Sequence, residues 1–167
     1  MLRYRCFSIF LMYKKNTGKK LENLIETQAE AMRARGELYI QKVDPPTRTI
    51  NTRAGKYTTL LPNPFPDFIG CLPSGRMVCI EAKSNQLKNL PFGKTGLRQK
   101  QLDDLLIWQS FNAVVGVVWQ NLKGFYWVTL DDIKKCVMSG RKSVPEEMPK
   151  KINSTNGYII NFLEYIN

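Results

Sequence analysis

The chain has 167 residues, which favours a single domain, and its hydrophobic content of 43% is enough to form a core. The 25 Lys and Arg residues outnumber the 14 Asp and Glu residues, and the net charge of +11 favours a polyanionic partner such as nucleic acid. Because the sequence contains no histidine, a Ser-His or Cys-His catalytic pair and zinc binding through imidazole are excluded.

The amino-terminal part is expected to be an extension followed by a helix. Residues 1–13 contain an apolar run that is much shorter than the roughly 18 residues of a membrane span, and we interpret them as an N-terminal extension of a single domain, 14–167. Apolar side chains at near-helical spacing then predict a helix from about Gly18 to Arg35. Lys19 and Lys20 at its start are candidate phosphate contacts, with a solvated tail as the alternative.

A strand and a long loop are expected next. Leu38–Val43 predicts a strand that ends at two prolines. From Asp44 to Phe65 the sequence predicts an irregular loop, which in a small domain is usually functional or disordered. Its basic residues favour a projection that contacts DNA, and a flexible connector remains the alternative; the candidate contacts are Arg48, Arg53 and Lys56.

A strand hairpin, Pro66–Gly70 with Val78–Lys83, carries the most informative residues. Its strand-forming side chains flank a Pro-Ser-Gly turn, yet it also contains Asp67, Glu81 and Lys83. Glu81 and Lys83 are two residues apart, so a strand directs both to one face. Charges among core strands are costly unless they are paired or bound to a metal. Two carboxylates beside a lysine suit a hard divalent cation and a polarised water, which is the chemistry of metal-dependent phosphodiester hydrolysis.

The segment from Ser84 to Lys100 contains basic but no acidic side chains, which favours a track for the phosphate backbone over a merely solvated loop. Its candidate contacts are Lys88, Lys94, Arg98 and Lys100. A helix is expected at about Leu97–Phe111. Gln101 lies in its first turns, where a glutamine is either a surface residue or one that orients water or phosphate.

The carboxyl-terminal part predicts two strands and a helix. Ala113–Trp119 is an apolar run typical of a buried strand, and Phe125–Leu130 predicts its hairpin partner. A capping box of Thr129 and Asp132 predicts a short helix that ends at Gly140. The polar segment 141–151 is expected to be a loop, and 158–166 a closing strand or a packed tail. The element order therefore predicts an α/β fold, with a small mixed sheet flanked by helices.

The four cysteines, Cys6, Cys71, Cys79 and Cys136, are scattered and form no C-x-x-C pair. They are typical of buried thiols in a reducing compartment, so we expect a cytoplasmic protein, in a bacterial cell or a phage-infected host. A Cys71–Cys79 disulfide would require an oxidising compartment.

The motif Asp67…Glu81-Ala82-Lys83 resembles that of the PD-(D/E)xK nuclease superfamily, and longer segments resemble its RecU-type Holliday junction resolvases. The similar segments are Gly18-Lys19-Lys20-Leu21-Glu22, Tyr39 to Pro46, Pro66-Asp67-Phe68, Ile80-Glu81-Ala82-Lys83 and Leu97-Arg98-Gln99-Lys100-Gln101. The resemblance covers about residues 18–137. The family's histidine before Gln101 is replaced here by Lys100.

The resemblance implies a restriction-endonuclease-like fold and a homodimer, dependent on Mg²⁺ or Mn²⁺, that nicks two opposed strands of a four-way DNA junction. Asp44–Phe65 would be the family's stalk. Asp67, Glu81 and the Ala82 carbonyl would hold the metal, and Lys83 would orient or deprotonate water. Glu22 would support the ion and Gln101 would position the nucleophile or phosphate.

Two other functions stay open on the sequence. The chain could be a nuclease of this superfamily that cuts flaps, nicked DNA or duplex DNA. It could also be a non-catalytic protein that binds junctions. No small-molecule cofactor or membrane partner is expected.

Overall fold

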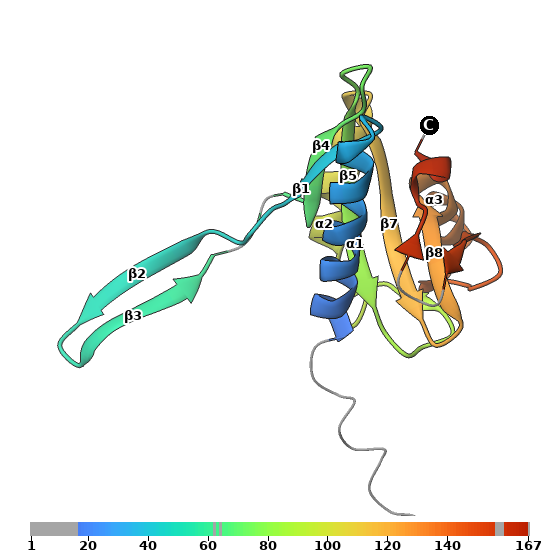
Figure 1. The fold of residues 1–167 in the computed structure, drawn as a ribbon. Coiled ribbons are helices and arrows are strands. Elements are labelled where there is room, and N and C mark those ends of the chain that lie inside the picture. The colour runs from blue at the N-terminus through green and yellow to red at the C-terminus, as the bar shows by residue number, and fades with distance from the viewer. Residues whose placement is uncertain (1–16, 62, 64, 156–158, 167) are drawn as a thin grey trace, which may run out of the picture.

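The computed structural model, which describes residues 17–61, 63, 65–155 and 159–166, contains a six-stranded mixed sheet with helices on both faces (Figure 1). Of the neighbouring strands, β5 and β7 are parallel and the other pairs are antiparallel. The strands in spatial order are β1 (Tyr39–Lys42), β4 (Phe68–Cys71), β5 (Met77–Ser84), β7 (Val114–Asn121), β8 (Gly124–Thr129) and β10 (Lys150–Ile152). The expected mixed α/β fold is confirmed.

Helix α1 (Thr17–Ala34) covers one face of the sheet, as its apolar spacing predicts. Its buried stripe, Leu21, Ile25, Ala29 and Met32, packs in one cluster with side chains of β4 and β5, including Phe68 and Ile80. Complete burial of one such large side chain contributes about 1.5–3 kcal/mol, so this contact fixes α1 on the sheet.

Helices α2 (Gln99–Ser110) and α3 (Leu130–Met138) cover the opposite face. Leu105 and Ile133 pack there with Cys79 of β5 and Val117 of β7. The expected capping box begins α3, since the Asp132 N–H donates to Thr129 Oγ1 at 3.1 Å and the Thr129 N–H donates to Asp132 Oδ2 at 3.1 Å. Side chains of β5 therefore alternate between two separate cores.

A two-stranded arm extends away from the sheet (Figure 1). It consists of β2 (Thr47–Thr52) and β3 (Gly55–Leu60), which pair antiparallel. The expectation of an irregular loop here is therefore wrong. Nearly all arm side chains are exposed, so the sequence lacks the polar–apolar alternation that reveals a half-buried strand. Its β-branched threonines nevertheless favour extended backbone.

The carboxyl-terminal segment has more structure than expected. The predicted loop 141–151 contains β9 (Ser143–Val144), which pairs with β6 (Leu90–Pro91), and the start of β10 at the sheet edge. Strands β11 (Ser154–Thr155) and β12 (Ile159–Ile160) pair next, followed by a 3-10 turn, Leu163–Tyr165. Phe162 and Ile166 are buried in the α1 cluster, as the packed-tail alternative predicts.

The cysteines that the structure describes do not form a disulfide with one another. Cys71, Cys79 and Cys136 are free thiols, so the Cys71–Cys79 disulfide is absent. Burial raises the pKa of the Cys79 thiol to about 12, which keeps it protonated and unreactive.

The N-terminal extension, 1–13, lies outside the described residues. Across the described part of the chain, none of the helices has the length and apolar character needed to cross a membrane.

Candidate active site

The two carboxylates of the predicted site meet where β4 and β5 pair. Phe68 lies opposite Ile80 in this antiparallel pair, so Asp67, the residue before β4, is brought to the middle of β5. The Ala82 N–H donates a hydrogen bond of 2.9 Å to Asp67 Oδ2. Residues that are 15 positions apart are thus joined directly.

Glu81 is the centre of the cluster and is only 2% exposed. Its Oε1 accepts a hydrogen bond of 2.6 Å from Lys83 Nζ and a second one from Gln101 Nε2. Gln101 is held in turn, because its Oε1 accepts a 3.1 Å hydrogen bond from the Arg98 N–H at the start of α2. The structure therefore brings Asp67, Glu81, Lys83 and Gln101 together, as the sequence predicts.

The environment of Glu81 raises its pKa from the ordinary 4.5 to about 7. Burial is the largest cause, and the Asp67 carboxylate raises it further, whereas the Lys83 ammonium lowers it. Near neutral pH a proton and a cation can therefore compete for this carboxylate.

A cavity of about 190 Å³ opens beside the two carboxylates. One wall comes from the beginning of α2 and includes Arg98, Lys100 and Gln101. The arm root also lines the cavity; by this we mean Pro45, Asn63, Phe65 and Pro66, where the chain enters and leaves the arm. Carboxylates and basic groups in one cavity suit a phosphate together with a cation.

The donor set fits a hard divalent cation. Asp67 and Glu81 supply carboxylate oxygens, and Ala82 between Glu81 and Lys83 supplies a backbone carbonyl. Burial first, and the Asp67 carboxylate after it, raise the pKa of Glu81, and a bound cation would offset both effects. No group of three or more Asp, Glu, Cys or His residues that could hold a metal occurs among the described residues.

Glu22 forms an ion pair outside the cavity lining. Its carboxylate lies 2.9 Å from Lys42 Nζ, which links α1 to β1. This ion pair also raises the pKa of Lys42. Support of the ion by Glu22 stays a prediction.

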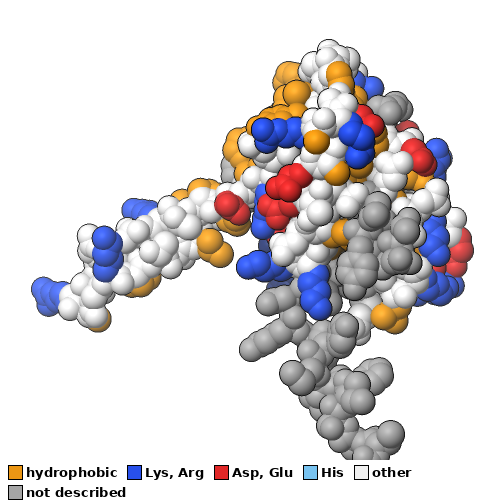
Figure 2. Space-filling view, viewed as in Figure 1, with side chains coloured by type: hydrophobic (Ala, Val, Ile, Leu, Met, Phe, Trp, Pro, Cys, Tyr) orange, Lys and Arg blue, Asp and Glu red, His pale blue; other side chains and the backbone are white. Residues whose placement is uncertain are grey.

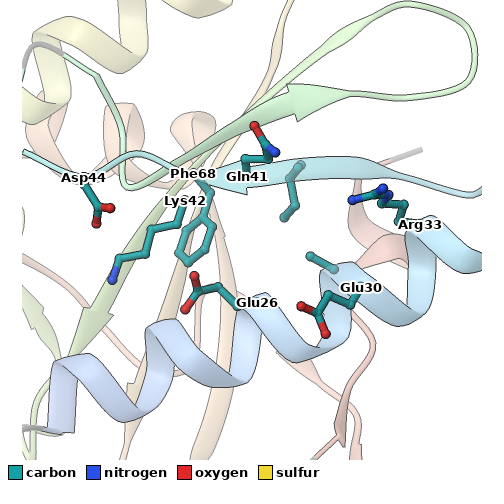
Figure 3. A pocket seen from close by; sticks show the side chains of 9 residues that line it. Glu26, Glu30, Arg33, Gln41, Lys42, Asp44 and Phe68 are labelled. Atoms are coloured by element: carbon teal, nitrogen blue, oxygen red, sulfur yellow. The ribbon is translucent and has the colours of Figure 1, made fainter.

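A second, separate groove of about 370 Å³ lies between α1 and β1 (Figure 3). Figure 3 shows Glu26 and Glu30 of α1 facing β1, with Lys42 and Asp44 at one end. This groove contains neither Asp67 nor Glu81.

All the candidate DNA contacts have exposed side chains: Lys19, Lys20, Arg48, Arg53, Lys56, Lys88, Lys94, Arg98 and Lys100. Two of them also form ion pairs, because Lys88 Nζ lies 2.8 Å from Glu147 Oε1 and Lys100 Nζ lies 2.6 Å from Asp104 Oδ2. A phosphate would have to compete with these carboxylates for the two lysines. Figure 2 shows Lys and Arg side chains along the arm and acidic side chains near its junction with the body.

Sequence reasoning missed the arm root as a wall of the cavity. Asn63 and Phe65 lie in the segment predicted to be an irregular loop, four and two positions before Asp67. The signal available in the sequence is this proximity, because a residue two positions from a metal-binding candidate cannot lie far from it.

Comparisons with known proteins include a family model that matches all of the described residues. The family model described as Recombination protein U, RecU, matches residues 16–167. Among solved structures, Hjc, a Holliday junction resolvase from the archaeal hyperthermophile Archaeoglobus fulgidus, is 12% identical with a TM-score of 0.44, over 70% of this chain and 75% of that chain. The protein SSO0001 is 15% identical with a TM-score of 0.35, over 77% and 61%. No curated protein sequence matches.

Proposed function

This chain belongs to the RecU family of Holliday junction resolvases, and we propose that it cleaves four-way junctions by Mg²⁺-dependent hydrolysis, with paired nicks made by a homodimer. The observation that carries the proposal is the convergence of Asp67, Glu81 and Lys83 at the centre of the sheet, where Asp67 and Glu81 line a cavity and Lys83 Nζ lies 2.6 Å from Glu81 Oε1. Glu81 and Lys83 share the face of β5 that α2 covers, as the contact of Gln101 with Glu81 indicates.

Asp67, Glu81 and the Ala82 carbonyl would hold the cation. When bound, Mg²⁺ supplies a Lewis acid for the scissile phosphate and lowers the pKa of water. Mn²⁺ should be able to substitute, since it prefers the same oxygen ligands.

Three side chains complete the mechanism. Lys83 Nζ lies 2.6 Å from Glu81 Oε1. As the ammonium it would orient the attacking water and stabilise charge on the phosphate oxygens, and as the neutral amine it would accept the proton of that water. Gln101 would hold the Glu81 carboxylate in a fixed position relative to the start of α2, because it hydrogen-bonds both Glu81 and the Arg98 N–H. Arg98, on the cavity wall, would hold the phosphate backbone without reading bases.

The test uses matched four-way junction, flap and linear duplex substrates, with Mg²⁺, with Mn²⁺ and with a chelator. We expect metal-dependent paired nicks in the junction only. Equal cutting of flap or duplex DNA would indicate a nuclease of different selectivity, and junction binding without nicking would indicate a binding protein. Sedimentation of the free protein measures the expected dimer independently of cleavage.

A further inference from the structure

Phe65 is an aromatic residue in an unusual place. It belongs to the arm root, lines the cavity that contains Asp67 and Glu81, and remains 45% exposed. Phe65 is the one aromatic side chain among the described residues that line this cavity, beside Asp67, Glu81 and Arg98. It gains little from folding, because nearly half of its surface stays in water.

The local structure holds the Phe65 backbone and ring in place. The Phe65 N–H donates a 3.1 Å hydrogen bond to Asn63 Oδ1, and Pro66, the next residue, is buried. The ring lies against Trp108 of α2, with centroids 6.3 Å apart and planes tilted by 38°. Where the chain enters the arm, the Val43 N–H donates a 2.8 Å hydrogen bond to the Asp67 carbonyl. This bond holds the entering segment next to the segment that leaves the arm.

The cavity therefore presents three different chemistries side by side. Asp67 and Glu81 provide a floor for a cation, and Arg98 provides a positive group for phosphate. Phe65 adds an apolar aromatic surface. A nucleotide has matching parts, since its phosphate is anionic and its base offers a flat π-face that stacks on aromatic rings without regard to sequence.

We propose that Phe65 is a positioning residue that stacks on the nucleobase next to the scissile phosphate. This inference rests on the proposed nuclease function. It adds that Phe65 of the arm root contacts one nucleobase of the substrate. A base can reach this ring only when it is unstacked from its duplex neighbour, as bases at a branch point or in a distorted strand can be. Phe65 thus favours cleavage of branched DNA over continuous duplex.

The experiment compares Phe65→Leu and Phe65→Ala with Phe65→Tyr and Phe65→Trp. Leucine keeps apolar contact with Trp108 but offers no ring for a base. Phe111, which is 78% exposed at the end of α2, provides the matched control Phe111→Leu. The first measurement is the single-turnover rate on a four-way junction at saturating protein. The second is the fluorescence of 2-aminopurine beside the cleavage position, bound by chains that also carry Asp67→Asn.

Loss of one stacked base predicts that Phe65→Leu and Phe65→Ala slow cleavage roughly ten- to a hundredfold. Phe65→Tyr and Phe65→Trp should stay within about threefold of the unmodified chain. The 2-aminopurine signal should be quenched with Phe, Tyr or Trp at position 65 and not with Leu or Ala. Phe111→Leu should change neither measurement.

Two results would overturn the proposal. One is a Phe65→Leu protein that cleaves and quenches like the unmodified chain. The other is slow cleavage by Phe65→Ala alone, accompanied by a lower melting temperature, because that indicates packing on Trp108. Failure of the proposed nuclease function gives a different result, because the unmodified chain would then not cleave any junction. The 2-aminopurine fluorescence of the bound junction would still report whether the residue at position 65 stacks on a base.

Discussion

The Ala82 N–H donates a 2.9 Å hydrogen bond to Asp67 Oδ2, which joins the residue before β4 to the residue between Glu81 and Lys83. This bond fixes one carboxylate oxygen of Asp67 on the backbone of β5. It explains why an acid at the end of a proline-rich segment lies beside the buried Glu81, where a shared cation would bind.

Asp67→Asn should reduce junction cleavage at least about a hundredfold, because an amide is a poor ligand for a hard cation in place of a carboxylate. The Ala82 N–H can still donate to the Asn oxygen, so the fold should be retained. Gel-shift affinity for the junction, measured without metal, should change little. Cleavage at the normal rate by this variant would show that Asp67 is not a metal ligand.

Glu81→Gln should stabilise the metal-free protein at pH 8. Because folding raises the pKa of Glu81 from 4.5 to about 7, the folded state binds a proton more tightly than the unfolded state. The free energy of unfolding therefore falls as pH rises from about 4.5 through 7, by on the order of 3 kcal/mol for this group. Gln cannot ionise and avoids that loss.

Urea unfolding of both proteins at several pH values, in the presence of a chelator, measures this difference. Adding Mg²⁺ at pH 8 should stabilise the unmodified protein and not Glu81→Gln, because only the carboxylate binds the ion strongly. Equal pH dependence of the two proteins between 4.5 and 7 would contradict the raised pKa.

Glu22→Gln should reduce cleavage by no more than about tenfold, much less than Asp67→Asn, because the Glu22 carboxylate is paired with Lys42 and does not line the cavity that contains Asp67 and Glu81. Lys42→Met is the matched variant, since it releases Glu22 without changing it. The measurement is the single-turnover rate of each variant on the same junction. A loss with Glu22→Gln as large as that with Asp67→Asn would restore the role predicted from the sequence.

Replacing Arg48, Arg53 and Lys56 by Gln should weaken junction binding and reduce its salt dependence. Each phosphate contact contributes about 0.9 to the slope of log K against log salt, so the slope should fall by about 2 to 3. The three side chains are exposed on the arm and its tip, so stability should change little. Lys134→Gln on α3 serves as a control away from the arm, because Lys134 hydrogen-bonds Gln109 of α2. An unchanged slope would remove the arm from the DNA interface.

Much of the fold follows from local signals in the sequence. The stripe that includes Leu21 and Ile25 predicts α1, and the turn between the two halves of the hairpin predicts the pairing of β4 with β5. The two-residue spacing of Glu81 and Lys83 places them on one face. These features depend on backbone periodicity and turn chemistry, which are properties of short segments.

Only the tertiary structure decided which partners each side chain has. Glu22 meets Lys42 because α1 packs on the edge strand, and Phe65 meets Trp108 because the arm root passes over α2. The pairing of β2 with β3 is likewise a contact between two exposed strands, without a buried face to mark it. Such contacts depend on how distant segments pack, and no local pattern of residues determines that packing.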